Sequence, residues 1–107
     1  MKRILFLCSQ NKLRSPTAES IFCNSEGWSV RSAGLNTGAE VYISTEDVEW
    51  AEYIFVMEQA HKSKLRKKFK HLIKNQKIIC LGIPDDYEFM DQELIDLLKS
   101  KVPNFVN

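Results

Sequence analysis

A cysteine and an arginine lie close together near the start of the chain, at a spacing that suits chemistry on phosphate. Cys8 follows the apolar run 4–7, and Arg14, Ser15 and Pro16 come six residues later. The thiolate form of cysteine is a nucleophile, and a helix N-terminus beside a guanidinium favours that form. A guanidinium also presents a planar fork that binds two phosphate oxygens. These residue types therefore indicate nucleophilic attack by Cys8 on a phosphate group held by Arg14.

The elements around this stretch must position the two side chains. The run 4–7 is too short for a core helix and suits a parallel strand covered on both faces. Pro16 suits the first turn of a helix. The residues between them must turn the backbone so that successive N–H groups point to one spot in front of a helix. The sequence thus predicts an anion-binding loop made of Ser9, Gln10, Asn11, Lys12, Leu13, Arg14 and Ser15.

We make more specific predictions for two residues of this loop. Asparagine tolerates left-handed backbone, so we expect Asn11 to adopt it and to hold the loop through side-chain to backbone hydrogen bonds. We expect the Ser15 hydroxyl to hydrogen-bond the Cys8 thiolate and to help it leave. The structural alternative is a buried cysteine at a strand end with a surface arginine nearby.

Length and composition limit the class of protein. The 107 residues suffice for one domain, which we expect to span 1–107, with 44% hydrophobic and 27% charged residues as in ordinary globular proteins. The net charge of +1 argues against a nucleic-acid binder. Three cysteines at unrelated spacings fit no disulfide or zinc pattern. No apolar run is long enough for a membrane span, so we expect a cytoplasmic protein without a membrane partner. The sequence indicates no oligomeric state.

The rest of the chain alternates between helix and strand patterns. Further strands are predicted over 28–32, 53–57 and 77–81, and loops over 33–40 and 82–90. Helices are predicted from Pro16 to a C-cap at Gly27, over 44–51, over 59–72, and from a cap at Asp91 to about Pro103. This alternation implies a parallel sheet with right-handed crossovers. We expect a three-layer α/β sandwich with strand order 2-1-3-4, flanked by helices, and the phosphate-binding loop after strand 1.

Charge is distributed unevenly along the second half of the chain. The stretch 61–77 holds eight Lys or Arg and no acid, whereas the stretch 85–96 holds six acids and no base. A solvated helix face followed by an acidic loop explains this pattern, and a partner-binding patch is the alternative.

The acidic loop supplies a candidate proton donor. In a parallel sheet the loops after strands 1 and 4 open on the same edge, so Asp85 and Asp86 can reach the Cys8 loop. A carboxylic acid there protonates a leaving oxygen, and as carboxylate it activates water. Adjacent acids help one another stay protonated, and Tyr87 suits stacking on an aromatic leaving group. Solvated loop carboxylates are the alternative.

Together these residues resemble the signature of low-molecular-weight protein tyrosine phosphatases, which reads Cys-x-Gly-Asn-x-Cys-Arg-Ser-Pro. The matching residues are Cys8, Asn11, Arg14, Ser15, Pro16, Ala18 and Glu19. Segments 32–34, 45–47, 54–57 and 85–87 resemble further family motifs, the last of them an Asp-Pro-Tyr acid loop.

The resemblance implies a function and a set of roles. It implies hydrolysis of phosphotyrosine or another aryl phosphate through a phosphocysteine at Cys8, with no metal or organic cofactor. It implies Asp85 as general acid and base, with Asp86 as the alternate because it replaces the family's proline. It also implies a supporting role for Ser32. The expected partner is a phosphorylated protein or a small aryl phosphate.

The sequence departs from the family in three places. Gln10 replaces a glycine and Leu13 replaces a cysteine. Only ten residues separate Gly34 from Thr45, where the family has a longer insert with a helix, an aromatic wall and a histidine that supports the loop. We therefore expect a more open pocket.

Three other functions use a similar loop. Thioredoxin-coupled arsenate reduction needs two relay cysteines, for which only Cys23 and Cys80 are available. A phosphocarrier similar to the IIB components of sugar phosphotransferase systems holds phosphocysteine without hydrolysing it. A non-catalytic module binds phosphate through an intact loop.

Overall fold

A four-stranded parallel sheet forms the centre of the computed structural model, which describes residues 1–106. Its strands are β1 (Lys2–Cys8), β2 (Trp28–Gly34), β3 (Tyr53–Val56) and β4 (Lys77–Cys80). The strand order is β2-β1-β3-β4, and every neighbouring pair is parallel. In register, Leu7 of β1 lies opposite Val56 of β3, which lies opposite Cys80 of β4. The predicted strand order 2-1-3-4 is confirmed.

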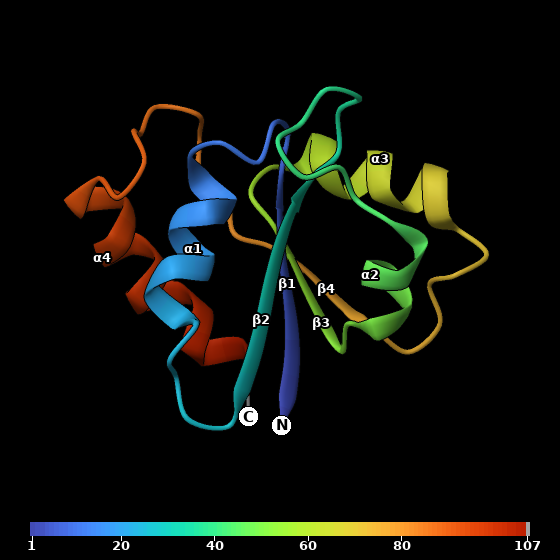
Figure 1. Cartoon of the computed structure of the whole chain (residues 1–107), viewed down its shortest axis with the longest axis horizontal. Coiled ribbons are helices and arrows are strands. Elements are labelled where there is room, and N and C mark those ends of the chain that lie inside the picture. The colour runs from blue at the N-terminus through green and yellow to red at the C-terminus, as the bar shows by residue number, and fades with distance from the viewer. Residues whose placement is uncertain (107) are drawn as a thin grey trace.

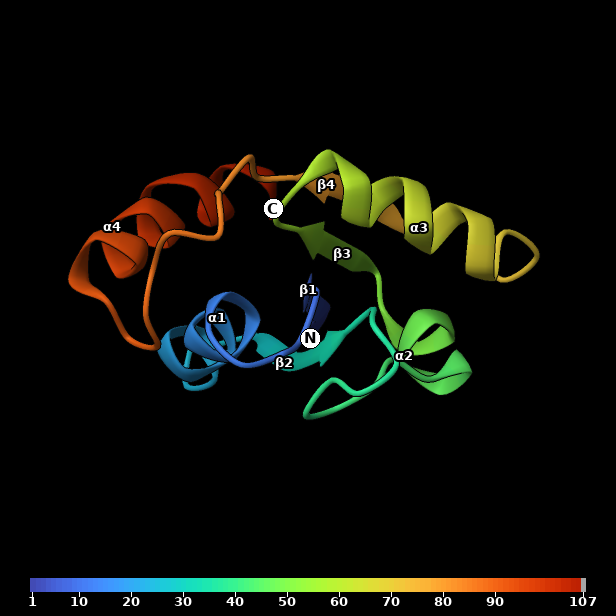
Figure 2. The same cartoon turned by 90° about the horizontal axis from the view of Figure 1, so that it is seen from above.

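Helices cover both faces of the sheet, as Figures 1 and 2 show. One face carries α1 (Arg14–Phe22) and α4 (Gln92–Lys101), followed by the short 3-10 helix η1 (Val102–Phe105). The other face carries α2 (Thr45–Trp50) and α3 (Gln59–Phe69). The three layers confirm the predicted sandwich.

Strand β1 is buried on both faces. Ile4 and Phe6 pack in the core under α1 and α4, whereas Leu5 and Leu7 pack in the core under α2 and α3, and none of the four is exposed. Burying each such side chain stabilises the fold by about 1.5–3 kcal/mol. A central strand whose residues 4–8 are buried therefore carries Cys8 at its carboxyl end.

Local capping fixes the starts of two helices. The Ser44 hydroxyl accepts from the backbone N–H of Asp47 at 3.1 Å, and the Asp47 carboxylate accepts from the N–H of Ser44 at 3.2 Å. Such a capping box satisfies two N–H groups that a helix start leaves unpaired. The predicted cap of the last helix is also present, since Asp91 accepts from the N–H of Glu93 at 2.9 Å.

Several predicted boundaries are wrong by a few residues. Helix α1 ends at Phe22, and Gly27 instead lies in the following turn with a φ of +80°, where its lack of a side chain is needed. Ala33 and Gly34 belong to β2 rather than to a loop, because they pair with Leu7 and Cys8 of the long central strand. Helix α3 ends at Phe69, three residues before its predicted end.

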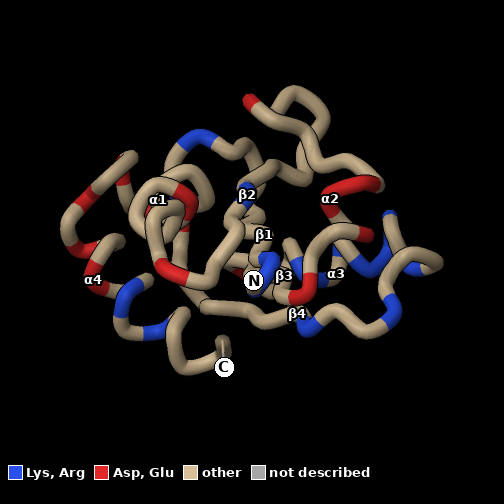
Figure 3. The backbone as a smooth tube through the Cα atoms, turned by 60° about the horizontal axis from the view of Figure 1, so that its bottom comes forward, with Lys and Arg blue, Asp and Glu red and all other residues tan. Residues whose placement is uncertain are grey.

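The charge asymmetry maps to opposite sides of the sheet. Figure 3 shows Lys and Arg along α3, and Asp and Glu along α4 and the segment that leads into it. Within residues 1–106, no helix is long and apolar enough to cross a membrane.

Candidate active site

The loop between β1 and α1 is held from outside by its carbonyl groups. The carbonyl oxygens of Cys8, Ser9 and Gln10 accept hydrogen bonds of 2.9–3.0 Å from N–H groups of the segment 35–40, which follows β2. In a trans peptide the N–H points opposite to the carbonyl. The next N–H groups along the loop therefore point away from the segment 35–40.

These N–H groups have no acceptor within the described residues. In the range 1–106, no backbone N–H of residues 9–15 donates to another protein group. Buried N–H groups are normally paired, and a run of free ones at a helix start is typical of an anion-binding loop. The N-terminus of α1 adds the positive end of its dipole. This loop can bind phosphate or a similar oxyanion.

Asn11 fixes the shape of the loop. It is buried with a φ of +54°, the left-handed conformation predicted for it. Its side-chain amide donates to the hydroxyls of Ser15 at 2.9 Å and Ser32 at 3.0 Å. The Ser32 hydroxyl in turn donates to Glu19. The predicted side-chain to backbone bonds are thus replaced by side-chain to side-chain bonds that tie the loop to α1 and β2.

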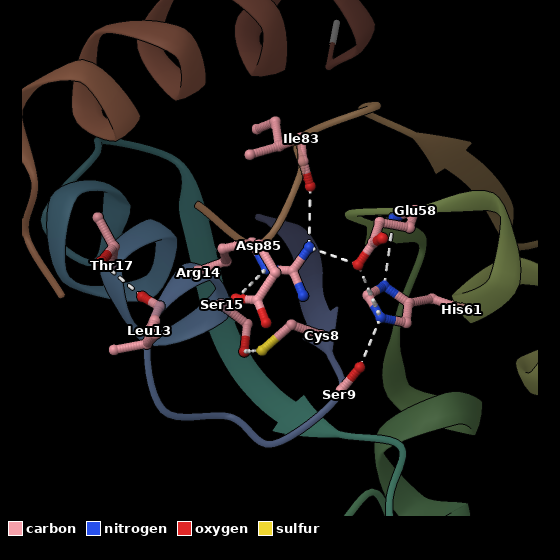
Figure 4. Close-up of polar contacts among 10 residues, drawn as sticks. All are labelled: Cys8, Ser9, Leu13, Arg14, Ser15, Thr17, Glu58, His61, Ile83 and Asp85. Atoms are coloured by element: carbon pink, nitrogen blue, oxygen red, sulfur yellow. Dashed lines mark hydrogen bonds and ion pairs between the residues drawn. The ribbon is translucent and has the colours of Figure 1, made fainter. Parts of the chain in front are cut away.

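Cys8 lies at the base of this loop, within hydrogen-bonding distance of Ser15. The Cys8 Sγ is buried and lies 2.9 Å from the Ser15 Oγ (Figure 4). The Ser15 hydroxyl accepts from Asn11 and can donate either to the Ala33 carbonyl at 3.4 Å or to the sulfur, which is the closer of the two. A hydroxyl that donates to sulfur stabilises the thiolate as nucleophile and as leaving group.

Arg14 is the most buried cation of the site. Its side chain is 3% exposed, and its Nη1 donates to the Glu58 carboxylate at 2.7 Å and to the Ile83 carbonyl at 2.9 Å. Its Nε lies 3.7 Å from the Asp85 carboxylate. Arg14 thus connects the loop after β1 to the segments that follow β3 and β4 (Figure 4).

The loop 82–90 between β4 and α4, called the acid loop below, holds Asp85 and Asp86 in different surroundings. Asp85 points toward Arg14 and is 67% exposed (Figure 4), whereas Asp86 is exposed and has no ion pair among residues 1–106. Tyr87 is half-buried and packs against the core that contains Cys8. The structure therefore brings Asp85, and not Asp86, to Arg14.

A threonine ties the acid loop to the start of α1. The N–H of Met90 donates to the Thr17 hydroxyl at 2.9 Å, and that hydroxyl donates to the Leu13 carbonyl at 2.6 Å. This bridge anchors the far end of the acid loop beside the anion-binding loop.

The other loop residues contribute backbone more than side chain. Gln10 and Lys12 are exposed, and Leu13 is 37% exposed. Their side chains are thus open to solvent, while their N–H groups belong to the unpaired run.

Two residues of the site were missed by sequence reasoning. Glu58 and His61 follow β3, where Glu58 contacts Arg14 and the buried His61 ring lies 2.9 Å from the Ser9 hydroxyl through Nε2 (Figure 4). The hydrogen bond from Arg14 lowers the pKa of Glu58. Burial lowers the pKa of His61, and the charge of Arg14 acts in the same direction. Their position after β3 could have revealed them, because β3 ends at the same edge of the sheet as β1.

Neither of the other cysteines lies within reach of Cys8. Cys80 is on β4, two strand spacings or about 10 Å from β1, beyond the Cα separation of about 7 Å that a disulfide tolerates. Cys23 is exposed at the far end of α1, a helix about 13 Å long. Within residues 1–106, no three His, Cys, Asp or Glu side chains are grouped to hold a metal ion.

Comparison with known proteins establishes the fold. No protein-family model and no curated protein sequence matches the chain. Among solved structures, the chain is similar to the YwlE arginine phosphatase from Geobacillus stearothermophilus, with 22% identity and a TM-score of 0.76 over 97% of this chain and 94% of that one. It is similar to the low molecular weight protein tyrosine phosphatase SP-PTP from Streptococcus pyogenes, with 19% identity and a TM-score of 0.79 over 100% and 95%.

A third similar structure comes from an animal. The drosophila arginine phosphatase DARP has 21% identity and a TM-score of 0.73, over 100% of this chain and 99% of that one. At such identities the likeness shows a shared fold and leaves activity to the site itself. The predicted resemblance to low-molecular-weight phosphatases is confirmed at the level of the fold.

Proposed function

We propose that the protein is a cysteine-dependent phosphatase that hydrolyses phosphate monoesters of aryl groups, including phosphotyrosine. One observation carries the proposal: the Cys8 sulfur sits at the base of a loop whose N–H groups at 9–15 are unpaired, with the Arg14 guanidinium beside it. This combination supplies a nucleophile together with donors for the three non-bridging oxygens of a phosphate.

The first step is transfer of the phosphoryl group to sulfur. The Cys8 Sγ forms a bond to phosphorus while the bond from phosphorus to the ester oxygen breaks. The proton of the Asp85 carboxylic acid passes to that oxygen, which leaves as an alcohol or phenol. The loop N–H groups and Arg14 bind the charge on the equatorial oxygens throughout.

The second step is hydrolysis of the phosphocysteine. The Asp85 carboxylate takes a proton from water, the water oxygen bonds to phosphorus, and the sulfur–phosphorus bond breaks. The Ser15 hydroxyl donates to the departing thiolate. Inorganic phosphate leaves, and Cys8 and Asp85 return to their starting states, so the cycle balances without a cofactor.

Assay of para-nitrophenyl phosphate hydrolysis tests the proposal. We expect Cys8→Ser to lower turnover by about 10³-fold or more, because loss of a nucleophile removes the covalent route. Cys23→Ser is the matched control, since Cys23 is exposed at the far end of α1, and we expect it to retain full turnover. A wild type without turnover, or a Cys8→Ser variant with normal turnover, contradicts the proposal.

A second candidate substrate is phosphoarginine. The carboxylates of Glu58 and Asp85 both lie beside Arg14 and are 42% and 67% exposed, and a cationic guanidinium is attracted to such groups. Two of the similar structures are also named arginine phosphatases. The ratio of kcat/KM for phosphoarginine and para-nitrophenyl phosphate decides between the two classes.

Phosphate-binding and turnover measurements on the wild type distinguish a non-catalytic, phosphate-binding role from catalysis. Phosphate binding by the wild type, together with no turnover of either substrate, identifies a binding module.

A further inference from the structure

The hydrogen bonds of Arg14 leave one edge of its guanidinium free. Nη1 is occupied by Glu58 at 2.7 Å and by the Ile83 carbonyl at 2.9 Å. Within residues 1–106, Nε and Nη2 donate no hydrogen bond, and the Asp85 oxygen at 3.7 Å from Nε is too distant for one. The Nε and Nη2 groups form a fork that matches two oxygens of a phosphate. Glu58 therefore holds the guanidinium by the edge that the anion does not need.

The hydrogen bonds of His61 define its tautomer. The backbone N–H of Glu58 donates to Nδ1 of His61 at 3.2 Å, so Nδ1 carries no proton. Burial lowers the pKa of His61 and favours the neutral ring. The single proton of the neutral ring is then on Nε2, which donates to the Ser9 hydroxyl at 2.9 Å.

This direction determines what the Ser9 hydroxyl can do. Because Ser9 accepts from His61, its own proton is not directed at the imidazole. Ser9 directly follows Cys8 in the loop. Its hydroxyl is thus available as a further donor to an anion bound in front of the sulfur.

Glu58 and His61 act together because of where they lie. Glu58 directly precedes α3 and His61 belongs to its first turn, three residues later, so both reach the same neighbour. That neighbour is the loop after β1, since β1 and β3 pair side by side. One helix start therefore supports both the cation and a hydroxyl of the anion site.

We infer that Glu58 and His61 are positioning residues of the anion-binding loop. Glu58 orients Arg14 so that Nε and Nη2 face the oxyanion, and His61 directs the Ser9 hydroxyl toward it. Neither residue reacts with the substrate. The inference rests on the proposed phosphatase function, but it concerns anion binding, which is measured without turnover.

Titration with inorganic phosphate tests the role of Glu58. We expect Glu58→Ala to weaken phosphate binding by about tenfold or more, since it releases a charge-assisted hydrogen bond that orients Arg14. Glu58→Gln keeps an acceptor oxygen, so we expect it to recover part of the affinity. Gln59→Ala is the matched control, because Gln59 is an exposed residue of the same helical turn. In turnover assays we expect Glu58→Ala to raise KM as well as to lower kcat.

Nitrogen NMR of the wild type tests the role of His61 without a substitution. We expect a neutral ring with its proton on Nε2, and a smaller loss of phosphate affinity for Ser9→Ala in a His61→Gln background than in the wild type. Circular dichroism checks that each variant is folded.

The outcomes separate this inference from the proposed function. Phosphate binding with wild-type affinity in Glu58→Ala, or a proton on Nδ1 of His61, overturns the inference even if the enzyme is active. A wild type that binds phosphate but does not turn over substrate refutes the proposed function. The phosphate-binding test of the Glu58 variants then still decides this inference. A wild type that does not bind phosphate overturns both.

Discussion

The two segments that form the candidate site differ in how firmly the molecule holds them. The anion-binding loop is fixed by carbonyl hydrogen bonds to the segment 35–40, by the buried Asn11 and by the buried Arg14. In the acid loop, Asp85 is 67% exposed and contacts Arg14 only at 3.7 Å. The loop is tied to α1 on either side of Asp85, at the Ile83 carbonyl, which accepts from Arg14, and at the Met90 N–H, which donates to Thr17, each at 2.9 Å.

This difference separates two parts of the chemistry. Donors that are fixed before the substrate arrives need no reorganisation during reaction, which is where electrostatic stabilisation is strongest. An acid on an exposed loop adjusts to the leaving group, and catalytic contacts of this kind commonly shorten when substrate binds. We therefore expect substitutions in the first segment to affect every substrate, and those in the second to depend on the leaving group.

Apart from loss of the Cys8 nucleophile, the largest effect is expected at Arg14. In Arg14→Lys, one ammonium must satisfy Glu58, the Ile83 carbonyl and two phosphate oxygens. It cannot do so, because it lacks the planar fork of a guanidinium. We expect kcat to fall by roughly 10²–10³-fold for all substrates, as for the loss of an oxyanion donor. Arg66→Lys, on the exposed part of α3, is the control. Equal losses in both variants contradict a specific role for Arg14.

The acid loop is tested by a pair of adjacent substitutions. Asp85→Asn removes the proton donor near Arg14, and we expect turnover of alkyl phosphates, which have poor leaving groups, to fall by about 10²-fold. We expect a smaller loss with para-nitrophenyl phosphate, and little change in Asp86→Asn with either ester. Steady-state kinetics on the two esters measures both. A larger loss in Asp86→Asn moves the acid role to Asp86.

The rigidity of the anion-binding loop is tested at Gly34. A Cβ added there lies 2.5 Å from the Ala39 Cβ, 2.8 Å from the Ser9 carbonyl oxygen and 3.0 Å from the Asn11 nitrogen. We expect Gly34→Ala to destabilise the fold by about 1–3 kcal/mol, as overpacking does. Thermal melting measures this, with a shift of about 4–8 °C for each kcal/mol in a domain of this size. Adding Ala39→Gly is expected to restore only part, because the backbone contacts remain, and full stability in Gly34→Ala contradicts a tightly held loop.

The smallest effect expected is the pH dependence from His61. Burial lowers the pKa of His61 in the folded protein, with the charges of Arg14 and Lys64 adding to this and those of Glu58 and Asp85 opposing it, while the pKa of an unfolded histidine is about 6.5. Below that pH the unfolded chain binds more protons, so stability falls as pH drops through the folded pKa and is fully present above about 6.5. Urea melts from pH 5 to 8 measure this, with His61→Gln losing the dependence and the exposed His71→Gln keeping it. An unchanged slope in His61→Gln contradicts the burial effect.

The sequence predicted the parts of the site that are local. Cys8, Asn11, Arg14 and Ser15 lie within one loop between a strand and a helix, so spacing alone places them together. Asp85 was predicted because the carboxyl ends of parallel strands share an edge. The same reasoning applied to β3 leads to Glu58 and His61. They were not predicted as site residues, because they lie at the start of a stretch that was interpreted as a basic amphipathic helix.

The segment after β2 shows what side-chain patterns cannot reveal. It was expected to leave the pocket open because it is short. In the structure its N–H groups bind the carbonyls of Cys8, Ser9 and Gln10 and so orient the anion-binding loop. Backbone hydrogen bonds of this kind leave little trace in the sequence, apart from a glycine such as Gly34 where two chains approach closely.

A crystal structure with bound vanadate tests the central claim most directly. Vanadate mimics a phosphoryl group in transfer, so it reports where the reacting atom sits. We predict vanadium bonded to the Cys8 sulfur, its equatorial oxygens on the N–H groups of residues 9–15 and on Nε and Nη2 of Arg14, and its apical oxygen toward Asp85. Vanadate bound away from Cys8, or held without the loop N–H groups and Arg14, contradicts the account.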